Sequence, residues 1–200
     1  MKIAALLTAF AASAAAFVTQ PVVKTTTTVV NAFDGELGDQ PPLGFWDPLN
    51  FCEDGDPEKF ARYRYVELKH GRICMLAFLG EVTTRAGIHL PGRIDYSDDT
   101  FDSIPNGWAA VGALPKEGVV QLLLFVGFLE LFIMKDITGG EFPGDFRNDW
   151  IDYGWDEFDP VEQESKRAIE LANGRGAMMG VLTLLVADQA GINLPLISSV

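Results

Sequence analysis

The feature that most constrains the fold of this chain is a motif that occurs twice, each time at the start of an apolar run. Residues 65–80 read YVELKHGRICMLAFLG, and residues 168–180 read AIELANGRGAMMG. Both contain the pattern Glu-x-x-His/Asn-Gly-Arg. Charged side chains next to apolar runs are costly unless they are paired, and inside a membrane they usually mark a functional site. The fold must therefore provide partners for these charges.

The spacing within each motif indicates where those partners lie. On an α-helix the Glu and the His or Asn share a face, because residues three apart differ by about 300°, or ~60° the shorter way. The Arg follows five residues after the Glu and points about 140° away, so it must pair with another helix. If a twofold axis relates the two copies, Glu67 meets Arg175. By the same symmetry, Glu170 meets Arg72.

Small residues near the arginines favour a close crossing of the two helices. Gly71 and Gly174 precede the arginines, and a Gly-x-x-x-Gly spacing spans residues 176–180. The repeat thus predicts a tight helix pair with four outward donors: Glu67, His70, Glu170 and Asn173. A salt-bridged pair without a ligand stays open as an alternative, although it leaves the His and the Asn without a partner. A di-iron bundle is disfavoured because the second copy lacks the His.

Three helical segments are predicted, at residues 59–86, 118–134 and 164–190, separated by stretches rich in Gly, Pro and Asp. The middle segment is apolar except for Gln121 and Glu130, and comes close to the ~20 residues that span a bilayer. The other two have shorter uncharged runs, so we expect weak hydropathy for them. The predicted fold class is an all-α membrane protein with three transmembrane helices, the first and third crossing as a pseudo-twofold ion-paired couple.

The charge distribution restricts partners and orientation. The formal net charge is −13, and no cluster of Lys and Arg is present, which excludes nucleic acid as a partner. Near the predicted helix ends, basic residues are more numerous on the side of the first helix's start, which places the N-terminus on the cis side of the membrane. That side has Lys59, Arg62, Arg64, Lys135, Arg147, Lys166 and Arg167; the other has Arg85, Arg93 and Lys116.

The N-terminal segment is predicted to be a targeting sequence. Residues 1–20 combine one Lys, an apolar run and a patch of small residues, as in a cleavable signal. The following stretch to residue 32 is rich in Thr and Val and has no acidic residue, which is typical of a second targeting segment. We therefore expect a two-part presequence over residues 1–32 and a folded domain over residues 33–200, with a retained N-terminal membrane anchor as the alternative.

The motif pair ELKHGR and ELANGR resembles the light-harvesting chlorophyll-binding superfamily, whose first and third membrane helices carry it. Further stretches resemble the fucoxanthin chlorophyll a/c-binding branch: LGFWDPLNF, YVELKHGR, IPNGWAA, MKDITGGEFPGDFRNDWIDYGWD and ELANGRGAMMG. The resemblance covers residues 33–194, with these motifs in the family's order. The prelude SAAAF also resembles the signal boundary of two-part plastid presequences, so that residues 1–32 are expected to direct import into a plastid.

The resemblance implies that side chains donate the axial ligand to the Mg of chlorophyll. By position, the implied ligands are Glu67, His70, Glu170 and Asn173, with Arg175 and Arg72 as the cross-paired cations. Gln121 and Glu130 are similar to further ligands of the middle helix, although Lys135 is an alternative partner for Glu130. Where the family usually has Gln or His, this chain has Ala187, followed by Asp188 and Gln189, so that site is lost, shifted or ligated through water.

The function implied is an antenna that binds chlorophyll a, chlorophyll c and fucoxanthin, with diadinoxanthin as a further candidate, in the thylakoid membrane of a plastid. The segments WDPLNF and YGWDEFDP are similar to family loops that hold carotenoid ends. Implied partners are other antenna subunits in a homo- or hetero-oligomer, photosystem I or II, and thylakoid lipids. Two alternatives are a pigment-free structural protein and a photoprotective quencher gated by protonation of loop acids, namely Asp95, Asp98, Asp99 or Asp102.

No enzyme activity is expected from the sequence. It contains no catalytic triad, phosphate-binding loop or thiol motif. The one histidine outside the repeated motif is His89, which lies close to Pro91 in a predicted surface loop.

Overall fold

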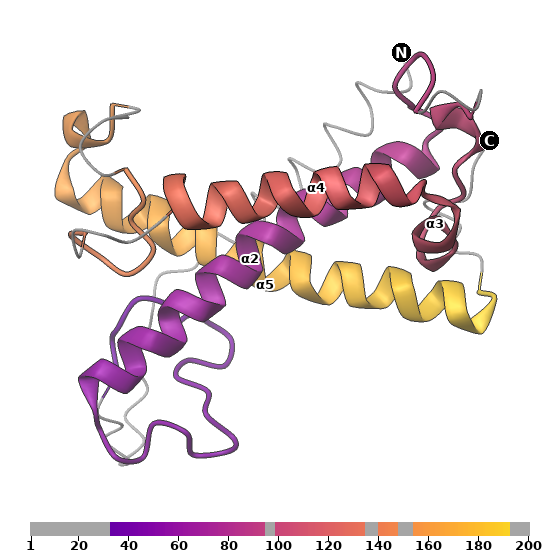
Figure 1. Ribbon diagram of the computed structural model, residues 1–200. Helices are drawn as coiled ribbons and strands as arrows, with labels where there is room; N and C mark the ends of the chain where they lie inside the picture. The colour runs from indigo at the N-terminus through magenta and orange to yellow at the C-terminus, as the bar shows by residue number, and fades with distance from the viewer. Residues whose placement is uncertain (1–32, 95–98, 135–139, 148–153, 193–200) are drawn as a thin grey trace.

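The computed structural model describes residues 33–94, 99–134, 140–147 and 154–192, so that the predicted presequence at residues 1–32 lies outside the described part. Three long helical segments dominate it (Figure 1). They are α2 (Pro57–Arg85), α4 (Lys116–Phe128), which continues as the π-helix η2 (Leu129–Ile133), and α5 (Pro160–Ala190). Shorter elements are η1 (Phe101–Ser103), α3 (Trp108–Ala113) and η3 (Trp155–Glu157).

The ends of the long helices follow from local sequence signals. Helix α2 begins at Pro57, and the side chain of the preceding Asp56 accepts a hydrogen bond of 3.0 Å from the backbone N–H of Glu58. Helix α5 likewise begins with a Pro after an Asp and ends at Gly191, which has φ of 65°. The three predicted helices are therefore present within a few residues of their expected bounds. Helix α3 was not predicted, because the Gly and Pro around it indicated a loop.

Helices α2 and α5 cross near their middles (Figure 1). Helix α4 runs in the direction opposite to both of them. Gly71 and Gly174 lie at the crossing, where a Cβ on either would be 3.0 Å from the Cα of the other. A side chain at either position would force the helices apart. The glycine spacing over residues 176–180 was predicted to belong to the same contact. It does so only in part: a Cβ on Gly180 would meet the ring of Phe78, but Gly176 faces open space.

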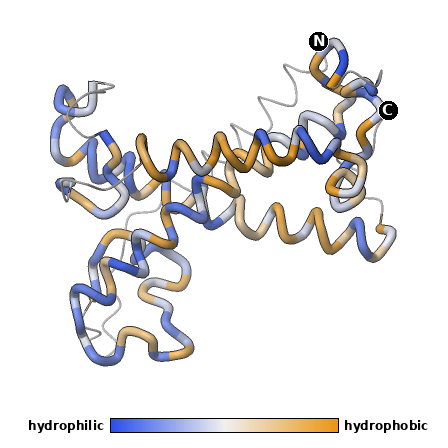
Figure 2. The backbone as a smooth tube through the Cα atoms, in the orientation of Figure 1, coloured by the Kyte–Doolittle hydropathy of each residue, from blue (hydrophilic) through white to orange (hydrophobic). Residues whose placement is uncertain are grey.

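Little of the described protein is buried in itself. The buried hydrophobic residues in the described ranges are Phe33, Leu68, Leu171, Leu184 and Ala187. In contrast, seven apolar side chains of α4 are between 46% and 69% exposed: Val120, Leu122, Leu123, Leu124, Phe125, Val126 and Phe128. Figure 2 shows that hydrophobic residues follow one another along much of α4. A continuous apolar surface of this kind requires lipid, bound ligands or another protein to cover it.

Of the described helices, α5 is the one whose length and composition suffice to cross a membrane. This differs from the expectation that the middle segment would come nearest to spanning a membrane. Helix α4 is only 13 residues long before the backbone changes to π-helix, so its apolar run is divided between two elements. The C-terminal half of α5, by contrast, continues without interruption to Ala190.

Candidate functional site

The centre of the molecule is a pair of ion pairs that join α2 to α5. Arg72 Nε donates to Glu170 Oε1 at 2.5 Å, and Arg175 Nε donates to Glu67 Oε1 at 2.7 Å. The side chains of both pairs are partly buried beside the glycine crossing. Each arginine therefore contacts the glutamate of the other helix, as the five-residue offset within each motif requires.

The same arginines also fasten two loops across the crossing. Arg175 Nη1 donates to the carbonyl of Gly38 at 2.8 Å, and Arg72 Nη1 donates to the carbonyl of Gly144 at 2.7 Å. Each loop precedes one helix and contacts the arginine of the other. Both glycines have positive φ, 102° for Gly38 and 87° for Gly144, a conformation that L side chains rarely adopt. The pseudo-twofold relation thus extends from the helices to the loops.

Two further contacts preserve this symmetry. Two residues after Gly38, the side-chain amide of Gln40 donates to the carbonyl of Ala168 at 3.0 Å. Two residues after Gly144, the ring of Phe146 packs edge-on against Tyr65, with centroids 6.0 Å apart. Neither loop contact was predicted from the sequence, although a Gly-Asp pair in each loop (Gly38-Asp39 and Gly144-Asp145) was an available signal.

Three predicted donors, His70, Gln121 and Asn173, face outward, and each has a ligand atom without a hydrogen-bond partner among the described residues. Nδ1 of His70 lies 2.8 Å from the carbonyl of Val66, four residues earlier. This contact uses Nδ1 as the donor and leaves Nε2 available as a ligand atom, which is the usual arrangement of a metal-binding imidazole. Asn173 and Gln121 are exposed, and neither side chain makes a hydrogen bond to another described residue.

Glu130 has a different environment from the other predicted donors. It lies in the π-helix η2, and its carboxylate pairs with Lys69 of α2. Lys135, the alternative partner considered from the sequence, lies outside the described residues. Lys69 was not predicted as a partner of Glu130, because its proximity depends on how α4 lies against α2, which no spacing within α4 reveals.

At the other end of the crossing helices, the region around Ala187 is occupied by protein contacts. Ala187 is 6% exposed. The carboxylate of Asp188 accepts a hydrogen bond of 2.5 Å from Arg85 of α2, and Arg85 also contacts Glu81 at 3.1 Å. Gln189 lines a cavity of about 320 Å³ together with Trp108 and other residues. Among these three positions, Gln189 is the exposed one.

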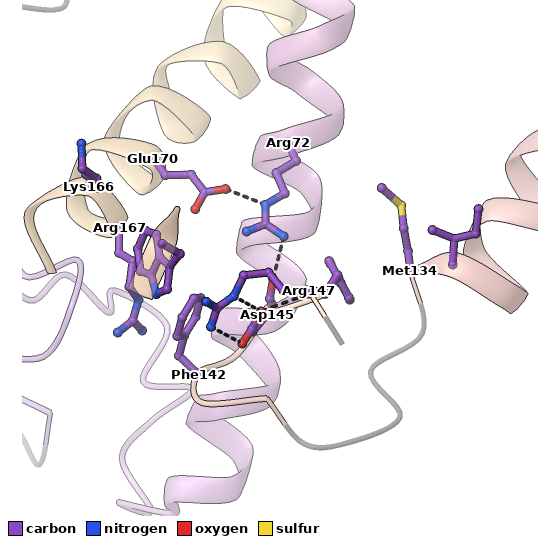
Figure 3. Close-up of a pocket in the computed structure, with 12 residues that line it drawn as sticks. Arg72, Met134, Phe142, Asp145, Arg147, Lys166, Arg167 and Glu170 are labelled. Atoms are coloured by element: carbon purple, nitrogen blue, oxygen red, sulfur yellow. Dashed lines mark hydrogen bonds and ion pairs between the residues drawn. The ribbon is translucent and has the colours of Figure 1, made fainter. Parts of the chain in front are cut away.

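A larger cavity, of about 460 Å³, opens next to Glu170 and Arg72 (Figure 3). Its walls are aromatic and aliphatic side chains together with charged groups: Arg72, Ile133, Met134, Phe142, Gly144, Asp145, Phe146, Arg147, Trp155, Lys166, Arg167 and Glu170. In its loop wall, Arg147 donates to both carboxylate oxygens of Asp145 at 2.9 Å. This contact holds the pKa of Asp145 below its ordinary value and raises the pKa of Arg147.

The donor set fits a metal that brings most of its own ligands. No group of three or more His, Cys, Asp or Glu side chains comes together within the described ranges to hold a bare ion. The exposed donors His70, Gln121 and Asn173 instead lie apart from one another on the helices. A magnesium ion already held by four nitrogens of a flat macrocycle needs one axial donor, and a single oxygen or imidazole nitrogen suffices. The surrounding apolar surface would meet the macrocycle and its hydrocarbon tail.

Comparison with known proteins identifies a family of chlorophyll-binding proteins. The model of the family described as "Chlorophyll A-B binding protein" matches residues 30–189. The chain is 57% identical to the chloroplastic fucoxanthin-chlorophyll a-c binding protein of Trieres chinensis, over 98% of both chains. It is 55% identical to fucoxanthin-chlorophyll a-c binding protein F of Phaeodactylum tricornutum, over 97% of this chain and 98% of the relative. The chain therefore belongs to the chlorophyll A-B binding protein family.

Proposed function

We propose that this protein is a light-harvesting antenna that binds chlorophyll a, chlorophyll c and fucoxanthin and passes excitation energy to a photosystem. The observation that carries the proposal is the combination of single, unpartnered donors with a hydrophobic surface that the chain does not cover itself. The names of the relatives, which state that those proteins bind fucoxanthin and chlorophylls a and c, support the same ligands here. Diadinoxanthin is a further candidate carotenoid.

The proposed axial ligands are the six predicted side chains: Glu67, His70, Gln121, Glu130, Glu170 and Asn173. Glu170 supports the assignment well, because Oε1 is paired with Arg72 while Oε2 has no partner among the described residues. A glutamate paired in this way can donate one oxygen to Mg and remain charge-compensated by the arginine on the other. For Glu130, Lys69 supplies the corresponding cation. A chlorophyll bound at these positions would absorb light, and the six side chains would bind its magnesium.

We further propose that α2, α4 with η2, and α5 all cross the thylakoid membrane of a plastid. Helix α5 is long and apolar enough to cross a membrane by itself, and the exposed apolar side chains of α4 would face pigment and lipid. A plastid location is supported by the relatives, whose names mark them as chloroplastic. Removal of residues 1–32 after import, assembly with other antenna subunits and contact with photosystem I or II complete the proposal. No bond-making chemistry is part of this role.

The photoprotective alternative would depend on the loop acids that follow α2. Asp95 and Asp98 lie outside the described residues. Asp102 is 79% exposed in its side chain and lies 3.0 Å from Nδ1 of His89, whose side chain is 19% exposed. This pair joins two residues outside the proposed ligand set, so light harvesting is the better supported function.

The test is to purify the protein from thylakoids, or refold it with a pigment extract, and record absorption together with extracted pigments. We expect chlorophyll a, chlorophyll c and fucoxanthin in fixed ratios, and fluorescence from chlorophyll a after excitation of fucoxanthin. A folded but colourless preparation would overturn the proposal in favour of a structural protein. A fluorescence lifetime that shortens strongly at low pH would favour a quencher.

A further inference from the structure

The two glutamates of the repeated motif differ in one contact. Glu67 has both carboxylate oxygens occupied: Oε1 accepts from Arg175 at 2.7 Å, and Oε2 accepts from Arg64 Nη1 at 2.5 Å. Glu170 uses only Oε1, and its Oε2 meets no hydrogen-bond donor in the described part of the chain. The pseudo-twofold relation is therefore broken at the oxygen that a metal would need.

The asymmetry originates three residues before each glutamate. Arg64 precedes Glu67 and Arg167 precedes Glu170 at the same spacing, so the two arginines are equivalent by symmetry. Arg64 points to its glutamate. Arg167 instead stacks on Phe142 at the wall of the larger cavity, 4.2 Å from the ring centroid, and contacts no carboxylate among the described residues.

The surroundings of Arg64 hold it in place. Its side chain is 10% exposed, and its guanidinium lies 5.1 Å from the centroid of the Phe60 ring, which in turn stacks on Phe33. Arg64 also lies against Gly38, the loop glycine that accepts a hydrogen bond from Arg175. Arg64 therefore sits in a formed site, with aromatic packing on one side and the glutamate on the other.

We propose that Arg64 caps Glu67, so that a magnesium-bearing pigment must displace this arginine from Oε2 and the Glu170 position loads first. The inference rests on the proposed pigment-binding function. A charge-assisted hydrogen bond is among the stronger ones in proteins, and an oxygen that accepts it is a poorer donor to a metal. The hydrogen bond from Arg64 therefore weakens pigment binding at Glu67 relative to Glu170.

The test is a chlorophyll a titration of the refolded full chain, with bound pigment counted after removal of free pigment. The Glu67 position is recognised by its loss from the double variant Glu67→Leu/Arg175→Leu, which removes the ligand together with its paired cation. In Arg64→Met the Glu67 position should load at about tenfold lower chlorophyll concentration, since a hydrogen bond to a charged group is worth such a factor or more. Arg167→Met is the matched control and should leave loading at Glu67 unchanged.

Two conservative variants separate the cap from a merely structural role. Arg64→Lys keeps the cation and should load close to the wild type, whereas Arg64→Gln should load more tightly, as Arg64→Met does, and replaces that variant if it fails to refold. If Arg64 only supported the fold, its removal would not make chlorophyll bind more tightly at the Glu67 position. Unchanged or weaker loading at Glu67 on removal of Arg64 overturns the proposal. A wild-type chain that takes up no pigment would instead contradict the proposed function.

Discussion

Replacing Gly71 by Ala tests whether the close crossing of α2 and α5 holds the centre of this protein together. The added Cβ would lie 3.0 Å from the Cα of Gly174 and 3.5 Å from its carbonyl carbon. Carbon atoms in comfortable contact are about 3.5–4.0 Å apart, so the helices must separate by roughly half an ångström. A backbone atom cannot rotate away as a side chain can. The shift would therefore lengthen both ion pairs at the crossing.

The magnitude follows from two opposing effects. Overpacking costs about 1–3 kcal/mol, and the upper end applies here because the obstructing atoms are backbone. Ala is a better helix former than Gly by about 1 kcal/mol, which leaves a net loss of about 2 kcal/mol. Gly80 provides the matched control on the same helix, because nothing lies within 4 Å of its would-be Cβ. Gly80→Ala should therefore stabilise the protein by about 1 kcal/mol.

The assay is far-ultraviolet circular dichroism of the protein in a mild detergent during titration with sodium dodecyl sulfate. Relative to the wild type, Gly71→Ala should lose helix at a lower dodecyl sulfate fraction and Gly80→Ala at a higher one. The two variants should differ by about 3 kcal/mol in the free energy of unfolding. A Gly71→Ala protein that matches the wild type, or two variants that shift in the same direction, would refute the reasoning.

Three other substitutions have defined outcomes. Arg175→Leu leaves Glu67 without its interhelical partner and should reduce stability by about 1–3 kcal/mol and remove one chlorophyll; unchanged pigment content would contradict the cross-pairing. His70→Leu should remove one chlorophyll, counted by pigment extraction, while the dodecyl sulfate midpoint of the pigment-free protein stays unchanged. The folded-state pKa of Asp145 is depressed by Arg147, so ionised Asp145 contributes stability above its unfolded pKa of about 4 that is lost as pH falls further. Asp145→Asn should therefore lower the dodecyl sulfate midpoint at pH 7, by a difference that shrinks below pH 4.

The spacing of residues along a helix carried the signal for two kinds of contact at the site, and only one of them was predicted. The offset of five residues excluded a pairing of Glu and Arg inside one motif, and in the structure each Arg pairs with the Glu of the other helix. The contact of Arg64 with Glu67, by contrast, was overlooked although the two are three residues apart, a spacing that favours pairing on a helix. Arg64 lies just outside the repeated motif, which begins at Glu67.

Other features were out of reach because they depend on how elements meet. The ion pair between Lys69 and Glu130 depends on how α4 and η2 pack against α2. The π-helix that carries Glu130 has no sequence signal as clear as a proline or a cap. The carbonyl groups of Gly38 and Gly144 are likewise invisible in a sequence, since every residue has one. What distinguishes these two is the positive φ that lets each loop approach an arginine.

The small buried core and the charged crossing together suggest how folding and binding are linked in this protein. With few side chains buried, the pigment-free chain depends heavily on Arg72, Arg175 and their glutamates to keep α2 against α5. The same glutamates are the proposed ligands, each through the oxygen that is not paired with the arginine of the other helix, so a bound pigment would lie at the contact that holds the helices. A ligand that binds only the folded chain stabilises it in proportion to its affinity and concentration. If Arg64 caps Glu67 until pigment arrives, the second oxygen of this partly buried carboxylate stays hydrogen-bonded during that interval, at the cost of weaker pigment binding at this position.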